Sequence, residues 1–214
     1  MERSKRTTTA AVIFLAVFHE VGVIGLNLDW TRDIFVQLVP LNLILSAAAL
    51  AYFHRQWTLN FGIFCFAVFW AGYLVEIVGV QTSLIFGPYH YDIALGPKIG
   101  GAPPLIGLNW LILVYISNII SQRLIPNIWL QATIGAALLV MMDVFIEPMA
   151  IRFDFWTWDT ETARIPIRNY LAWYVIGWVM SFGFHSLQQE KTNDLAGPLY
   201  VIQLLFFVSF MVVS

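Results

Sequence analysis

The stretch "GYLVEIVGVQTSLIFGPYHYD", residues 72–92, begins as an apolar helix and ends as a loop rich in Gly, Pro and Tyr. One carboxylate, Glu76, lies in the apolar part, before the loop begins. A carboxylate in hydrocarbon costs several kcal/mol, roughly 2.5–3.5 on insertion scales, so an acidic residue at such a place is a candidate for function. Since no basic residue lies within a turn of Glu76, we favour a functional role over a structural one.

The whole chain shares the apolar character of this stretch. Of its 214 residues, 59% are hydrophobic and 11% are charged, and the mean hydropathy is +0.75. Soluble domains carry about 25% charged residues. We therefore expect an integral membrane protein with a single transmembrane domain, residues 1–214. The net charge of −2 indicates no nucleic-acid surface, and the single cysteine, Cys65, cannot form an intramolecular disulfide.

A bilayer is crossed by about 20 mainly apolar residues. The sequence predicts an all-α, polytopic bundle of about seven transmembrane helices, over residues 10–28, 34–53, 59–80, 104–121, 127–149, 169–187 and 198–214. The basic N-terminal segment resembles a signal anchor, and we interpret the first span as retained. With the N-terminus inside, the inner segments carry six Lys and Arg residues and the outer segments five, so the absolute orientation stays open. We expect a multi-pass protein of the cytoplasmic (inner) membrane.

Two connections are longer than the others, residues 81–103 and 150–168. Long loops in a compact domain are usually functional or disordered, and these are rich in Trp, Tyr, Gly and Arg. We interpret them as functional loops. With seven spans, both lie on one face, opposite the N-terminus.

The carboxylates within the predicted spans are Glu20, Glu76, Asp143 and Glu147. All lie on odd-numbered helices, in the half nearer the two long loops, so we expect them to gather at one depth. Asp143 and Glu147 are four residues apart and share one helix face. Two neighbouring carboxylates in a low dielectric do not both ionise readily, so one is expected to serve as a proton donor.

Structural alternatives stay open for these groups. Asp143 could equally pair with Arg152, Arg164 or Arg168 and hold the second loop in place. For Glu20, a buried hydrogen bond to His19 that locks the first helix is at least as plausible as catalysis. The Trp and Tyr residues near the carboxylates belong to interfacial belts in many membrane proteins, although aromatic rings also stabilise cations.

Several other chemistries have little support. The four histidines lie far apart, whereas a membrane di-iron enzyme needs clustered ligands, and no Gly-rich nucleotide loop follows a strand. The last span has no lysine for a retinal Schiff base. Asp143 and Glu147 form a D-x-x-x-E pattern that matches prenyltransferase magnesium motifs only weakly. We expect no metal and no cofactor.

Four motifs in order resemble a known family. They are "EIVGVQTSLIFGPYHY" (76–91), "LGPKIGGAPPLIGLNW" (95–110), "MDVFIEP" (142–148) and "WTW" followed by "IPIRNYLAW" (156–173). Together they resemble the CruF-type carotenoid biosynthesis proteins, membrane hydratases that add water to an acyclic carotenoid end, and the bisanhydrobacterioruberin hydratases are similar. The chain departs from the family pattern at Gly101-Ala102 and at Ala172, and these departures bear on the substrate.

The resemblance implies a cofactor-independent hydro-lyase that protonates the terminal C=C of a ψ-end to a tertiary carbocation, which water converts to a tertiary alcohol. The implied catalytic residues are Glu76, Asp143 and Glu147, and the implied substrate-binding residues are Tyr89, Tyr91, Asn109, Trp110, Trp156, Trp158, Asn169 and Trp173. Further candidates are Glu20, His19, His90, Arg164 and Arg168.

Two other functions remain open. A membrane carotenoid cyclase would begin with the same protonation, but the polyene would trap the cation. A non-enzymatic carotenoid or lipid carrier, or a transporter, would use the carboxylates for structure or proton coupling. The expected partners are a carotenoid within the bilayer, water and other enzymes of the same pathway.

Overall fold

The computed structural model describes residues 5–161, 164–188 and 191–212. Within these ranges the chain forms helices joined by short turns, with two short strands near one end. The elements are α1 (Lys5–Asn27), α2 (Arg32–Gln37), α3 (Val39–Phe53), α4 (Leu59–Thr82), β1 (Tyr89–Tyr91), α5 (Leu105–Leu124), α6 (Ile128–Arg152), β2 (Trp156–Trp158), α7 (Ile167–Ser186) and α8 (Ala196–Val212).

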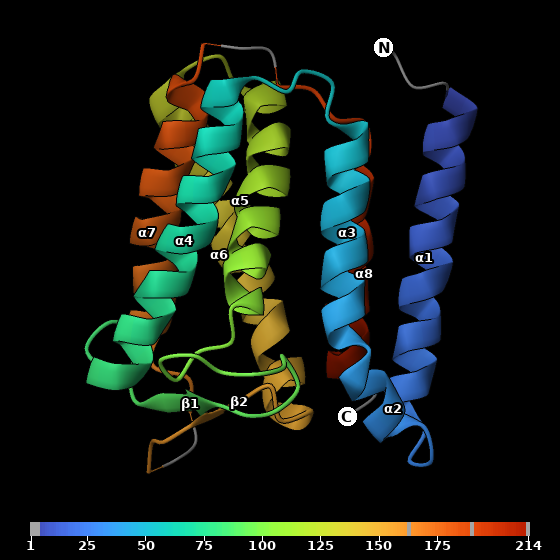
Figure 1. Ribbon diagram of the computed structural model, residues 1–214, viewed down its shortest axis with the longest axis vertical. Helices are drawn as coiled ribbons and strands as arrows, with labels where there is room; N and C mark the ends of the chain where they lie inside the picture. The colour runs from blue at the N-terminus through green and yellow to red at the C-terminus, as the bar shows by residue number, and fades with distance from the viewer. Residues whose placement is uncertain (1–4, 162–163, 189–190, 213–214) are drawn as a thin grey trace.

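The long helices run roughly parallel to one another and form two groups (Figure 1). In the larger group, α6 packs against both α5 and α7, and α4 packs against α5. Helices α1 and α3 lie on the other side, and α8 joins the groups because it contacts α1, α5 and α6. Both strands and α2 lie at the end of the bundle opposite the N-terminus (Figure 1).

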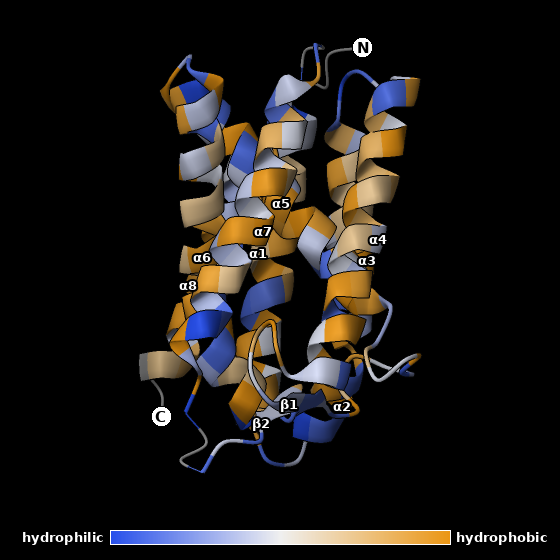
Figure 2. Ribbon diagram, turned by 90° about the vertical axis from the view of Figure 1, so that its left-hand side faces the viewer, coloured by the Kyte–Doolittle hydropathy of each residue, from blue (hydrophilic) through white to orange (hydrophobic). Residues whose placement is uncertain are grey.

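Four helices are long and apolar enough to cross a membrane: α1, α4, α5 and α6. Helices α3 and α8 are apolar but shorter. Hydrophilic residues gather at the two ends of the bundle, and apolar residues cover most of the helices between them (Figure 2). A helix lies in each of the seven predicted ranges, so the helical prediction is supported, but the count of seven membrane spans stays a prediction.

The predicted span 34–53 is not one helix. The chain forms α2, breaks at Leu38, and continues as α3, which carries Pro40 in its first turn. Proline has no backbone N–H, and its ring clashes with the carbonyl four residues earlier, which here is that of Val36. Proline is tolerated in a first turn, where the missing donor costs nothing. The chain therefore starts a new helix at this point.

The two long connections, predicted as loops, contain the strands. Strands β1 and β2 pair antiparallel, with Tyr89 opposite Trp158 and Tyr91 opposite Trp156. These four aromatic side chains are buried, while the middle residues of both strands, His90 and Thr157, are exposed. Side chains alternate along a strand, so the pair turns four aromatic groups toward the bundle and its polar groups away.

Candidate active site

The three carboxylates on α4 and α6 meet in one buried pocket above the strand pair. Glu76, Asp143 and Glu147 are each at most 3% exposed. The pocket has a volume of about 270 Å³. Its lining comes from α4, α5, α6, α7 and both strands: Glu76, Phe86, Tyr89, Tyr91, Ile106, Asp143, Glu147, Trp156, Trp158, Asn169 and Trp173.

Glu76 accepts hydrogen bonds from three directions. The Tyr89 and Tyr91 hydroxyls donate to Oε2, at 2.5 and 2.8 Å. The indole Nε1–H of Trp110 donates to Oε1 at 2.9 Å. Hydrogen bonds to a charged acceptor are stronger than neutral ones, and an indole N–H can only donate. This set of donors suits an ionised carboxylate.

Two glycines of α4 admit the groups that surround Glu76. A Cβ atom at Gly72 would lie 2.6 Å from the Trp110 side chain, and one at Gly79 would lie 2.6 Å from the Phe86 ring. Gly72 and Gly79 lie four residues before and three residues after Glu76, hence on the same helix face. Because these glycines have no side chain, α5 and the loop that carries Phe86 can approach the Glu76 carboxylate closely.

Asn169 of α7 connects the two carboxylates of α6. Its Nδ2 donates to Asp143 Oδ2 at 3.0 Å and to Glu147 Oε1 at 3.2 Å. Glu147 Oε2 also accepts from the indole nitrogens of Trp156, at 3.0 Å, and Trp158, at 2.9 Å. Among the described residues, Glu147 therefore accepts three such bonds and Asp143 accepts one. The strand pair thus supplies hydroxyl donors to Glu76 and indole donors to Glu147.

The two tyrosines of β1 keep their protons. Burial raises the pKa of Tyr89 and of Tyr91 above the ordinary value, and the negative charge of Glu76 raises both further. Both side chains are therefore neutral phenols in the physiological range, and their O–H groups remain available as donors.

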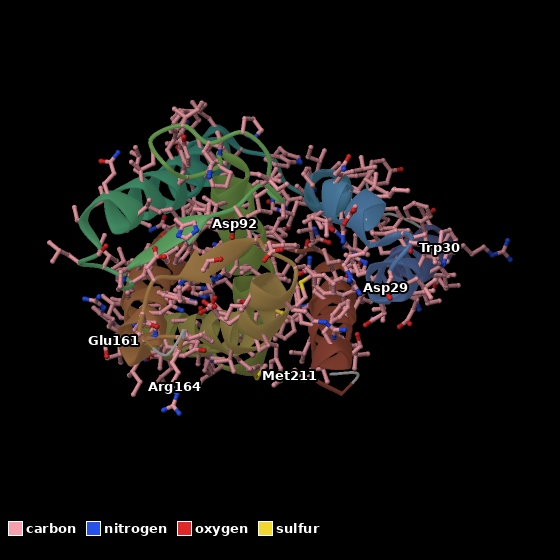
Figure 3. The ribbon with its side chains drawn as sticks, turned by 90° about the horizontal axis from the view of Figure 1, so that it is seen from below. Asp29, Trp30, Asp92, Glu161, Arg164 and Met211 are labelled. Carbon is pink, nitrogen blue, oxygen red and sulfur yellow. The ribbon has the colours of Figure 1, made fainter. Side chains whose placement is uncertain are left out.

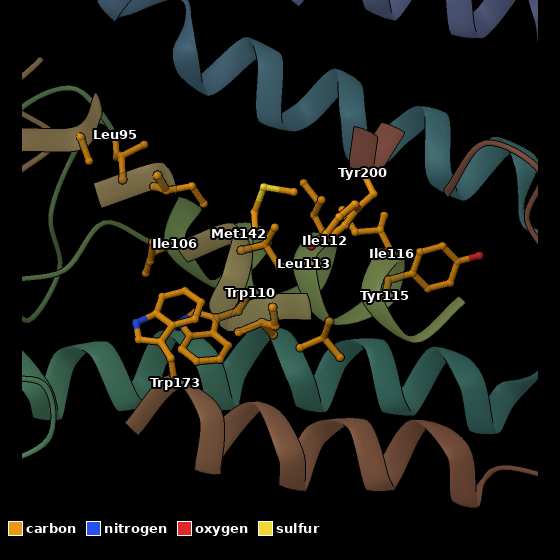
Figure 4. Close-up of a cluster of buried hydrophobic side chains, with 14 of the residues drawn as sticks. Leu95, Ile106, Trp110, Ile112, Leu113, Tyr115, Ile116, Met142, Trp173 and Tyr200 are labelled. Atoms are coloured by element: carbon orange, nitrogen blue, oxygen red, sulfur yellow. The ribbon is translucent and has the colours of Figure 1, made fainter. Parts of the chain in front are cut away.

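A stacked pair of tryptophans forms one wall beside Glu76. The rings of Trp110 and Trp173 lie 3.8 Å apart between centroids, with 11° between their planes. Figure 4 shows the two rings face to face, with Ile106 close by. Trp173 lines the pocket itself. An aromatic face near a developing cation contributes about 0.5–2 kcal/mol when water is excluded.

A larger cavity of about 670 Å³ adjoins the acidic pocket. Ile106 and Trp156 line both. Asn109, predicted at the polar end with the tyrosines, lines this larger cavity and not the acidic pocket. Successive helix residues point about 100° apart. Because Trp110 faces Glu76, its neighbour Asn109 faces elsewhere, and the predicted position of Asn109 is corrected.

The structure does not bring Glu20 to the other carboxylates. Glu20 is exposed on α1, while the adjacent His19 is buried. His19 bonds to the Leu15 carbonyl and approaches Asn42. The predicted gathering is therefore wrong for Glu20, and so is the alternative of a buried His19–Glu20 hydrogen bond, because the two side chains point to different sides of the helix.

Three further candidates lie outside the acidic pocket. His90 is half exposed on the outer side of the strand pair, where its ring contacts the Asp159 carboxylate at 2.9 Å. Arg164 and Arg168 are exposed, and Arg164 points away from the bundle in the view from below (Figure 3). No ion pair among the described residues joins Asp143 or Glu147 to an arginine, so the alternative in which arginines hold these carboxylates is not supported.

The pairing of the two strands was missed by the sequence analysis, although a signal exists. "YHY" at 89–91 and "WTW" at 156–158 both alternate aromatic and polar residues, which is the period of a strand with one buried face. The lining residues Phe86 and Ile106 were also missed, because an apolar residue in an apolar chain carries no signal of its own.

Comparisons with known proteins identify the family of the chain. The family model described as "Carotenoid biosynthesis protein" matches residues 38–214. Bisanhydrobacterioruberin hydratase of Haloarcula japonica is 27% identical over 127 residues, which cover 52% of this chain and 42% of the relative. The chain thus spans less than half the length of this curated relative. No solved structure matches the chain. The chain belongs to the carotenoid biosynthesis protein family.

Proposed function

We propose that the protein is a carotenoid hydratase, which adds water to the terminal C=C of an acyclic ψ-end and forms a tertiary alcohol. The observation that carries the proposal is the acidic pocket, where three buried carboxylates share one space with aromatic walls. The name of the Haloarcula japonica relative, a hydratase, supports the same reaction class. A buried acid beside an apolar chamber suits proton transfer to an alkene.

Asp143 is the proton donor in this proposal. Glu76 and Glu147 each accept three hydrogen bonds from groups that donate, whereas Asp143 accepts one, from Asn169. Donors stabilise the ionised form of a carboxyl group. The three acidic groups lie close together, so one proton shared among them resides best on the group with fewest donors, which is Asp143.

The proton passes to the less substituted carbon of the terminal C=C, whose π electrons form the new C–H bond. The positive charge that develops on the tertiary carbon is stabilised by the carboxylates of Glu76 and Glu147 and by the ring face of Trp173. A water oxygen then forms the C–O bond and releases one proton. Each turnover consumes one alkene and one water, with no net change in protons.

The substrate would reach the pocket from the bilayer. The larger cavity shares Val39, Asn42 and Phe206 with a further cavity of about 580 Å³ between α1, α2, α3 and α8. Val21 and Leu38 line that further cavity and are 47% and 40% exposed. Neighbouring, mainly apolar cavities between the lipid side and Trp156 suit the entry of a long polyene.

Expression in a host that makes lycopene tests the proposal. We expect a pigment heavier than lycopene by one water per reacted end, and more polar on chromatography. A cyclase would give an isomer of equal mass. A carrier or transporter would leave the pigment unchanged. Lycopene recovered unchanged, or only isomerised, from cells with folded protein in the membrane would contradict hydration.

A further inference from the structure

A second polar group lines the larger cavity, formed by His19 of α1, Asn42 of α3 and Gln203 of α8. We call it the Gln203 group. Gln203 is 7% exposed, and its Oε1 has no hydrogen-bond partner among the described residues. A buried amide oxygen without a partner costs free energy comparable to a lost hydrogen bond, so it indicates a ligand that donates one.

His19 offers a second acceptor in the same wall. Its Nδ1 lies 2.8 Å from the Leu15 carbonyl oxygen, which can only accept, so Nδ1 carries the hydrogen. The Nε2 atom therefore carries a lone pair that can accept a hydrogen bond. The amide nitrogen of Asn42 lies 3.5 Å from it, which is at the outer limit of a hydrogen bond. The wall thus combines two acceptors, His19 Nε2 and Gln203 Oε1, with one amide donor.

The larger cavity, which the Gln203 group lines, shares Ile106 and Trp156 with the acidic pocket. The residues of the Gln203 group come from α1, α3 and α8, whereas the carboxylates come from α4 and α6, which belong to the other helix group (Figure 1). Trp156 is shared by both spaces: its indole nitrogen donates to Glu147, and the residue also lines the larger cavity. A chain end at Ile106 and Trp156 would therefore lie between an acid and a polar wall.

We infer that the Gln203 group binds a water molecule, and that this water is the one that adds to the cation. A buried water needs about 2–4 polar partners and a cavity of sufficient size, and the Gln203 group offers three polar side chains in a cavity with room for a water molecule. The water donates to His19 Nε2 and Gln203 Oε1 and accepts from Asn42. A mainly apolar chamber thereby holds the second reactant.

The role in the reaction rests on the proposed function. After Asp143 protonates the alkene, the oxygen of the bound water forms the C–O bond with the tertiary cation. The resulting oxonium loses its proton to the lone pair of His19 Nε2, and the proton then leaves to the medium. Asp143 takes one proton from the medium, so the balance is one alkene and one water to one alcohol.

Infrared spectra of the purified protein without carotenoid test the water site directly. Spectra in H₂¹⁶O and H₂¹⁸O differ in the O–H stretch of bound water but not in protein O–H or N–H bands. We expect an isotope-sensitive band in the wild type that is lost in Gln203→Leu and retained in Gln131→Leu, which removes a buried glutamine bonded to the Ile125 carbonyl at the other end of α6. An unchanged band in Gln203→Leu would overturn the site.

A partition experiment in D₂O tests the role. A cation that finds no water loses a proton and returns to the alkene, now labelled with deuterium. In Gln203→Leu and in His19→Leu we expect the ratio of alcohol to labelled alkene to fall at least about fivefold, the scale of one lost hydrogen bond. Gln131→Leu should keep the wild-type ratio. Alcohol and labelled alkene that fall together would mean a structural defect and overturn the role.

Two further outcomes distinguish a failure of the proposed function from a failure of the water site. A wild-type protein that neither labels nor hydrates any ψ-end carotenoid would contradict the proposed function, while the infrared comparison would still decide whether the Gln203 group holds water. An O–H band that appears only when an alcohol-bearing carotenoid is added would mean that the site takes that hydroxyl, and it would overturn the assignment to water.

Discussion

Two buried polar clusters lie at opposite ends of α5, α6 and α7, and they are built differently. The acidic pocket has three carboxylates next to the strand pair. The other cluster, which we call the Asn118 cluster, joins α5 to α7 through neutral groups. Asn118 donates from Nδ2 to Ser181 and to the Val114 carbonyl and accepts at Oδ1 from Nε2 of His185, at 2.8 Å.

Both clusters depend on a glycine in the neighbouring helix. A Cβ atom at Gly135 of α6 would lie 2.3 Å from Asn118 Oδ1, as one at Gly72 would lie 2.6 Å from the Trp110 side chain. In the Asn118 cluster, donors and acceptors are matched without charge, which stabilises the packing of two helices. In the acidic pocket, burial of three carboxylates is expensive. The comparison teaches that similar packing can surround a neutral cluster, which suits stability, and an acidic one, which suits the proposed chemistry.

The largest effect is expected for Asp143→Asn. The amide has nearly the size of the acid but carries no transferable proton, so hydration should fall by about 10²–10⁴-fold, the usual contribution of a general acid. The apparent Tm of the purified protein should stay near wild type. Alcohol formation is measured by mass in membranes that contain lycopene. A folded variant with normal turnover would mean that Glu76 or Glu147, and not Asp143, is the proton donor.

Glu76→Gln should cost about 10²-fold in rate, since the neutral amide no longer balances the charge of the cation. The Tyr89, Tyr91 and Trp110 donors remain, so the protein should fold. The two carboxyl variants are separated by D₂O labelling: Asp143→Asn should abolish labelling of the alkene, whereas Glu76→Gln should only slow it. Equal labelling in both variants would contradict the assigned roles.

Trp158→Phe removes one of three donors to Glu147 and keeps an aromatic ring at the strand pair. We expect a loss of about tenfold in turnover, the scale of one hydrogen bond to a charged group. The matched control is Trp178→Phe, which removes an indole bonded to Thr133 away from the pocket. The same rate loss in both variants would show that general packing, and not the bond to Glu147, is responsible.

Asn118→Leu should lower stability and leave turnover unchanged, which is the opposite of the variants in the acidic pocket. His185 and Ser181 lose a buried partner, so the free energy of unfolding should fall by about 1–3 kcal/mol, seen as a lower apparent Tm. Turnover per folded molecule should be unchanged. A variant with normal stability and lost hydration would break the distinction between the two clusters.

The smallest effect is expected for chelation. The carboxylate oxygens of Glu76 and Glu147 already accept hydrogen bonds, and within residues 5–161, 164–188 and 191–212 no three His, Cys, Asp or Glu side chains are placed so that they could hold a metal ion together. EDTA should leave hydration unchanged. Activity lost with EDTA and restored by a divalent ion would make Asp143 and Glu147 the first ligands to test.

The sequence analysis expected Glu76, Asp143 and Glu147 to lie together, and the structure brings these three into one pocket. Asp143 and Glu147 share a face by their separation of four, and Glu76 is costly wherever its helix lies in a membrane. The errors concern neighbours on a helix: Glu20 beside His19, and Asn109 beside Trp110. The two side chains of each pair lie on different faces of the helix. When both faces are apolar, the hydropathy of the sequence does not show which of the two side chains faces the interior of the bundle.

The strand pair could not be predicted with the same reasoning. The alternation of aromatic and polar residues covers only three positions in each strand, which is a weak signal, and the partner of β1 lies far along the chain: Thr157 bonds to Asp92 across a separation of 65 residues. Tyrosine and tryptophan at the end of a span also suit an interfacial belt. The function of Trp156 and Trp158 as donors to Glu147 therefore becomes visible only in three dimensions.

The long separation between β1 and β2 has a consequence for biosynthesis. During translation α4 and α5 emerge first, so Glu76 can meet Tyr89, Tyr91 and Trp110 before α6 exists. Glu147 must enter the membrane before the ribosome delivers Trp156 and Trp158, and Asn169 follows later still. Contacts between distant segments form late in folding. We therefore expect nascent chains that end before β2 to be recognised as incomplete by membrane quality control, because Asp143 and Glu147 then lack their donors Trp156, Trp158 and Asn169.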